Sequence, residues 1–146
     1  MRRETLVCDT SFVGHFLRRR RQPERYAHWS ETDIARVRAA ILAISIVTVA
    51  ELRAGYIQAG WSSRRVADAE RRWAGFSPVL IDDPYLNEWA RLRTVAWKTG
   101  IAISDNDLWV AATASVRSRV LVTCDRDHLR IARALNGEVL FFEPPI

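Results

Sequence analysis

The stretch Val7-Cys8-Asp9-Thr10-Ser11 runs from apolar residues straight into a carboxylate, and Leu121-Val122-Thr123-Cys124-Asp125 does the same. Each pattern predicts a short buried strand that ends at an acid. If both strands belong to one parallel sheet, Asp9 and Asp125 emerge at the same edge. Open α/β sheets bind their ligands at that edge, outside the carboxyl ends of the strands. The two stretches therefore predict both a fold class and the place of a functional site.

The rest of the chain alternates between strand-like and helix-like segments. This alternation predicts an α/β protein whose parallel sheet is covered by helices on both faces. Pro78 places its strand at an edge of the sheet. The expected strands cover residues 6–8, 41–46, 76–81, 120–123 and 138–142. The expected helices cover residues 10–20, 23–38, 48–60, 62–75, 82–99 and 104–114, with a short one from residue 127.

Length and composition indicate one basic globular domain, residues 1–146. Twenty-two Lys and Arg oppose seventeen Asp and Glu, for a net charge of +5. Nearly all the bases are arginine, which suits bidentate phosphate contacts and a polyanionic partner. No signal peptide is evident, and no apolar run approaches the ~20 residues of a spanning helix, so a cytoplasmic protein is expected. Two cysteines do not make a disulfide framework.

Two further acids, Glu51 and Asp107, lie in helix-starting segments that follow predicted strands. Each acid has a purely structural alternative. Asp9 and Asp125 can cap helices, Thr48–Glu51 reads as a capping box, and Ser104–Asp107 fits a looser version of it. Four caps that gather at one sheet edge are better explained together, as a cation site. Oxygen ligands without a zinc-like spacing of histidines favour Mg²⁺ or Mn²⁺.

At this point the chain resembles the PIN-domain ribonucleases, specifically the VapC-type toxins of VapBC toxin–antitoxin pairs. The resemblance covers nearly the whole length and rests on four segments in order. They are VCDTS (7–11), SIVTVAELRAG (45–55), NDLWVAATA (106–114) and LVTCDRDH (121–128).

The resemblance implies a flavodoxin-like three-layer sandwich with about five parallel strands. It also implies an endoribonuclease that uses one or two Mg²⁺ or Mn²⁺ ions and a metal-activated water, and a cognate VapB-type antitoxin. A homodimer or a toxin–antitoxin hetero-oligomer is expected. The implied catalytic and metal-binding residues are Asp9, Glu51, Asp107 and Asp125, and Thr123 and Ser11 match positions that line the site.

The chain departs from the family pattern at two positions beside the fourth acid. Cys124 stands where an arginine is common, and His128 stands where a phenylalanine is common. Both departures leave the four acids in place, and they put RNA contacts near Asp125 in question. Asp127 is a secondary candidate for the site, and Asp105 is a weaker one.

Several other features carry alternatives. Arg18, Arg19, Arg20 and Arg21 form either a solvated face or an RNA-backbone contact. Trp89, Arg93 and Trp97 recur at helical spacing, which favours core packing over a dimer interface. Trp61 and Trp73 could line an antitoxin groove. Cys8 and Cys124 are expected to be buried and reduced, and a redox role is a minor hypothesis.

Two competing functions stay open. One is a nucleic-acid-binding or interaction module that uses the same fold without catalysis. The other is a phosphatase with an aspartyl nucleophile. The second is disfavoured, because Asp9-Thr10-Ser11 lacks the acid that such enzymes usually carry two residues after the nucleophile.

Overall fold

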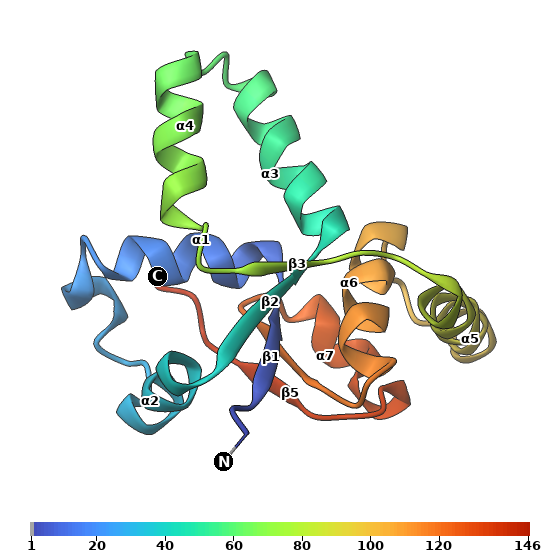
Figure 1. Ribbon diagram of the computed structural model, residues 1–146. Coiled ribbons are helices and arrows are strands. Elements are labelled where there is room, and N and C mark those ends of the chain that lie inside the picture. The colour runs from blue at the N-terminus through green and yellow to red at the C-terminus, as the bar shows by residue number, and fades with distance from the viewer. Residues whose placement is uncertain (1) are drawn as a thin grey trace.

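The structure is a computed structural model that describes residues 2–146. Its centre is one sheet of parallel strands in the order β3-β2-β1-β4-β5 (Figure 1). The strands are β1 (Thr5–Cys8), β2 (Ile41–Ser45), β3 (Ser77–Val79), β4 (Val120–Thr123) and β5 (Val139–Phe141). The helices are α1 (Thr10–Arg19), α2 (Glu31–Ala39), α3 (Ile46–Gln58), α4 (Ser63–Arg72), α5 (Asp83–Thr99), α6 (Asp105–Ser115) and α7 (Asp127–Ile131). The three-layer α/β prediction is confirmed.

The strand order reverses beside β1. From β1 the chain adds β2 and β3 on one side, and then crosses to add β4 and β5 on the other. In the register of this crossover, Leu6 lies opposite Val120 and Cys8 opposite Val122. The carboxyl ends of β1 and β4 therefore lie side by side, at the topological switch point where α/β sheets bind ligands.

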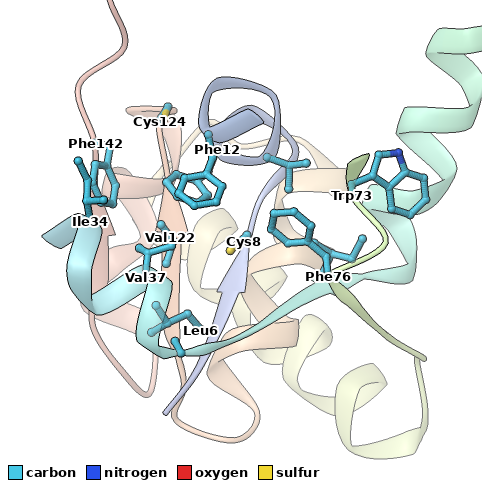
Figure 2. Close-up of a cluster of buried hydrophobic side chains, with 14 of the residues drawn as sticks. Leu6, Cys8, Phe12, Ile34, Val37, Trp73, Phe76, Val122, Cys124 and Phe142 are labelled. Atoms are coloured by element: carbon cyan, nitrogen blue, oxygen red, sulfur yellow. The ribbon is translucent and has the colours of Figure 1, made fainter. Parts of the chain in front are cut away.

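Alternate residues of the central strands pack into two cores, because successive side chains of a strand point to opposite faces. Leu6 and Cys8 join the core beneath α1 and α2. That core also contains Phe12, Ile34 and Val122, which Figure 2 labels together with Phe142 from the chain's end. Val7 and Leu121 face the other way, into the core that α5, α6 and α7 cover.

Helices α3 and α4 form a hairpin that projects from the sheet edge on which β3 lies (Figure 1). Between them, Tyr56 and Trp61 stack with ring centroids 5.2 Å apart, and the buried Trp73 donates a hydrogen bond to the Tyr56 hydroxyl. No helix within residues 2–146 has both the length and the apolar character that crossing a bilayer requires.

Two sequence-based expectations, on the extent of one helix and on the buried face of another, are wrong. The segment 23–38 is not one helix: a 3₁₀ turn spans Pro23–Tyr26, and α2 starts only after Ser30, whose hydroxyl caps the Asp33 amide. The break lets the Trp29 indole reach the carbonyl of Glu143, at 2.7 Å. A tertiary contact with the far end of the chain thus accompanies the interruption.

The second error concerns which face of α5 is buried. Trp97 was expected in the core but is 74% exposed. The residues of α5 that face the core are Tyr85, Glu88, Leu92 and Ala96. They also follow helical spacing, on the face next to the one that carries Trp89 and Trp97. Trp89 is half-buried because it stacks on Trp109 of α6, with ring centroids 4.9 Å apart.

A buried carboxylate on α5 ties that helix to α6 and to the loop before β5. Glu88 accepts hydrogen bonds from Ser115 and Asn136 and from both ends of the Arg91 guanidinium. The bonds from Arg91 hold the pKa of Glu88 below its ordinary value, against the opposing effect of burial. Glu88 is therefore ionised and paired at neutral pH.

We expect Glu88→Ala to lower the free energy of unfolding by about 2 kcal/mol at pH 7, because Ser115 and Asn136 lose a buried acceptor. Chemical denaturation measures this. Because the folded-state pKa is depressed, the contribution is present above about pH 4.3 and is lost as the pH falls through the lowered pKa, so the difference should shrink in acid. Glu24→Ala, at an exposed position, is the control and should stay within about 0.5 kcal/mol.

Candidate active site

Asp9 is the most deeply fixed of the predicted acids. It directly follows β1, and its backbone N–H continues the sheet by donating to the Val122 carbonyl at 3.0 Å. Its carboxylate caps α1 by accepting from the Phe12 amide at 2.8 Å. The side chain of Asp9 is nearly buried, at 5% exposed. Asp9 is therefore a helix cap, as the structural alternative expected, and the same carboxylate also lines the acidic cavity.

Two hydroxyls bind Asp9 to the end of β4. Thr123 donates to Asp9 Oδ2 at 2.5 Å while accepting from the Asp125 amide at 2.9 Å. Ser11 donates to Asp9 at 2.8 Å and accepts from the Cys124 amide at 3.1 Å. Both side chains therefore join the segment after β1 to the end of β4. Ser11 lines the cavity between the acids, whereas Thr123 is fully buried and contacts Asp9 from below that lining.

Glu51 reaches the site from α3, but not as a helix cap. The expected capping box at Thr48 is wrong, because the helix starts directly after β2 and Ser45 caps it by accepting from the Val47 amide. Glu51 consequently lies in the second turn. Its carboxylate accepts a hydrogen bond from the Thr10 hydroxyl at 2.9 Å, which turns it toward the start of α1.

Asp107 enters from the first turn of α6. The Ser104 hydroxyl caps this helix by accepting from the Asp107 amide at 3.1 Å, so half of the expected capping arrangement is present. Within residues 2–146, the Asp107 carboxylate makes no hydrogen bond to the cap. It is 29% exposed and free to face the other acids.

Asp125 lies in the loop before α7, and Asp127 is the first residue of that helix. The Asp125 carboxylate accepts from the backbone amide of Asp127 at 2.9 Å, and this bond orients the Asp125 side chain. One carboxylate oxygen from each of Asp107, Asp125 and Asp127 lies within 4.8 Å of the others. Asp127 thus belongs to the acidic cluster, while Asp105 points away and pairs with Arg93 at 2.9 Å.

The four acids predicted from the sequence meet around one cavity of about 180 Å³. Its walls are Asp9, Thr10, Ser11, Glu51, Asp107, Val110 and Asp125. Four carboxylates around one small cavity repel one another unless a cation or a proton joins them. A donor set made of oxygens, open to solvent on one side, fits Mg²⁺ or Mn²⁺, which keep water and substrate oxygens as further ligands.

His128 lies behind this cavity and is 1% exposed. Its Nε2 is 3.3 Å from Asp9 Oδ2 and 3.6 Å from Asp107 Oδ1. Burial lowers the pKa of His128, but the contact with Asp9 and the charges of Asp107 and Asp125 raise it more. The net pKa of His128 therefore lies above its ordinary value. Sequence reasoning noted the residue only as a departure from the family pattern and missed these contacts.

The two cysteines flank the site without joining. Both are free and buried. Burial raises the pKa of the Cys8 thiol, and it raises the pKa of Cys124 to about 12. Thiols that stay protonated react slowly with oxidants, so these surroundings disfavour the redox hypothesis.

The arginine run does not act as one surface. Arg18 and Arg21 line a second cavity, of about 200 Å³, between α1 and the α3–α4 hairpin. Arg19 approaches Glu31 at 3.7 Å, and Arg20 lies over the Phe16 ring. Trp61 and Trp73 line the same second cavity, as the groove hypothesis required.

Comparison with known proteins agrees with this geometry. The family model described as "PIN domain" matches residues 6–134. The chain is 33% identical to Ribonuclease VapC5 of Mycobacterium tuberculosis, over 68% of this chain and 75% of that protein. It is 28% identical to Ribonuclease VapC4 of the same organism, over 84% and 87% of the two chains.

Solved structures show the same fold. A VapBC-5 toxin–antitoxin structure from Mycobacterium tuberculosis superposes with a TM-score of 0.67 at 28% identity, over 94% of this chain and 98% of that one. VapBC2 from Rickettsia felis, bound to a DNA fragment from its promoter, gives a TM-score of 0.76 at 19% identity, over 95% and 99% of the chains. With its acids gathered at the switch point of a five-stranded parallel sheet, this chain belongs to the PIN-domain family and resembles the VapC proteins within it.

Proposed function

We propose that this protein is a metal-dependent endoribonuclease toxin of the VapC type. The observation that carries the proposal is the meeting of Asp9, Glu51, Asp107 and Asp125 around one cavity at the switch point of the sheet. The relatives named as ribonucleases support the choice of RNA as the substrate. The basic net charge of +5 suits a polyanionic substrate.

The acids would hold one or two Mg²⁺ or Mn²⁺ ions, with Asp127 as a further ligand from the cluster it shares with Asp107 and Asp125. When bound, such ions lower the pKa of a coordinated water and neutralise charge on a phosphodiester. Thr123 and Ser11 fix Asp9 through their hydroxyls, so the carboxylate keeps one orientation toward the cavity. We assign the attack to water and not to a side chain. The Ser11 hydroxyl is already hydrogen-bonded to Asp9, and the thiols of Cys8 and Cys124 stay protonated.

Arginines at the end of α1 would contact the rest of the substrate. Arg18 and Arg21 border the second cavity, and α1 begins at Asp9. With a rise of about 1.5 Å per residue, Arg18 lies roughly 14 Å along the helix from the catalytic end. Phosphates several nucleotides from the cleaved bond could therefore reach Arg18, Arg20 and Arg21, while Arg19 is partly occupied by Glu31.

A cognate VapB-type antitoxin is the proposed partner, in a homodimer or a toxin–antitoxin hetero-oligomer in the cytoplasm. The neighbours found by structure comparison are described as VapBC complexes, which supports this pairing. The second cavity combines aromatic and apolar walls with Arg18, Arg21 and Arg72. Such a lining suits an amphipathic segment that carries acidic residues.

The alternative is a nucleic-acid-binding or interaction module without catalysis. It would share the fold and the charge, but it would have no need of four convergent carboxylates. Incubation of several structured and unstructured RNAs with the purified protein and Mn²⁺ separates the two functions. Intact RNA in every case would favour the binding module.

We expect Asp9→Asn and Asp107→Asn to reduce RNA cleavage at least ~100-fold, because each removes a charge that the cation requires. Mapping of cleavage sites in total RNA measures this. Asp105→Asn is the matched control, since Asp105 is two residues from Asp107 but pairs with Arg93 outside the cavity. Full cleavage by folded Asp9→Asn protein would refute the assignment of the site.

We expect millimolar Mg²⁺ or Mn²⁺ to raise the melting temperature by several degrees, because the ion binds only the folded site. At about 100-fold above its dissociation constant, a ligand adds roughly 2.7 kcal/mol of stability. Removal of metal with a chelator should reverse the shift. Asp107→Asn should abolish it and Asp105→Asn should keep it; equal shifts in both variants would point to binding elsewhere.

A further inference from the structure

His128 is the one imidazole in contact with the acidic site among residues 2–146. It is 1% exposed, and it does not line the cavity that Asp9 and Asp107 line. It therefore approaches the two carboxylates from the protein interior and leaves the cavity side open. A ligand could enter from solvent without displacing it.

The burial of this imidazole needs an explanation. Its Nδ1 atom has no hydrogen-bond partner among residues 2–146, so that nitrogen gains nothing from its surroundings. Burial of a polar group without compensation costs free energy, and an apolar side chain would fill the same space without that cost. Among residues 2–146, the only polar contacts of the imidazole that offset its burial are those of Nε2 with Asp9 and Asp107.

Of the two acids, Asp107 depends more on His128. Asp9 is held by Phe12, Ser11 and Thr123 as well. The Asp107 carboxylate makes no hydrogen bond within residues 2–146, and its 3.6 Å contact with His128 is its only ionic contact there. Removal of the imidazole would leave Asp107 unrestrained and repelled by its acidic neighbours.

We infer that His128 is a positioning residue, which holds Asp107 next to Asp9 so that both carboxylates can share one divalent cation. This rests on the proposed metal-dependent function and deepens it. His128 acts from the protein side of the carboxylates, as the partners behind metal ligands do, and the loss of such partners typically costs about 10- to 100-fold in metal affinity.

The test is a titration of Mn²⁺ into the purified full chain at one pH. Calorimetry and the electron paramagnetic resonance signal of Mn²⁺ measure the binding. We expect His128→Leu to bind Mn²⁺ about 10- to 100-fold more weakly than wild type. His128→Gln should stay within about threefold, because the glutamine amide nitrogen can reach the place of imidazole Nε2. His28→Gln is the control for loss of a histidine, since the His28 imidazole hydrogen-bonds to the Glu143 carbonyl and does not line the acidic cavity.

Affinity in folded His128→Leu equal to or tighter than wild type would overturn the inference. If His128→Leu does not fold, His128→Asn replaces it, because the shorter amide cannot reach the Nε2 position; equal affinity of the Asn and Gln variants would then overturn it. Absence of Mn²⁺ binding by wild type would overturn it as well. RNA cleavage is scored separately: His128-dependent Mn²⁺ binding without cleavage would refute the nuclease function and leave the positioning role intact.

Discussion

The site depends on the hydrogen bonds that fasten the end of β1 to the end of β4. Thr123 and Ser11 each bond to Asp9, and each also accepts a backbone N–H from the loop after β4. Because the strand order reverses between these strands, the two loops would otherwise diverge toward different helices. The Thr123 and Ser11 hydroxyls join the two loops, and they donate hydrogen bonds to the almost buried carboxylate of Asp9.

Structural roles and the proposed metal-binding role coincide in the same acids. Asp9 caps α1 and also faces the cavity, and Asp125 orders its own loop by accepting from the Asp127 amide. A cap uses part of a carboxylate's capacity to accept, since two oxygens carry about four lone-pair sites. The remainder is available to a cation. From the sequence, capping and metal binding were alternative explanations of these acids. In the structure, one carboxylate can cap a helix and still face the cavity.

Errors of prediction occurred where a competing local cap or the packing of helices overrides the sequence pattern. Thr48 and Glu51 have the spacing of a capping box, yet α3 begins earlier because β2 passes directly into it and Ser45 serves as the cap. On α5, helical periodicity was recognised but its phase was misread. Large aromatic residues suggested the core, whereas Leu92 and Ala96 face it and Trp97 points to solvent. Small and aliphatic residues fit the close approach of α5 to α6.

The sequence by itself determined the alternation of strands and helices, the β4 strand at residues 120–123, and the acids that follow the strands. These features are local, because they depend on apolar runs, on helix-starting residues and on the parity of strand residues. Only the tertiary structure decided which side chains meet: Thr10 with Glu51, Asp127 with Asp107, and His128 with Asp9. His128 and Asp9 lie 119 positions apart, and the pairing of β1 with β4 brings them together. The pairing of β1 with β2 does the same for Thr10 and Glu51.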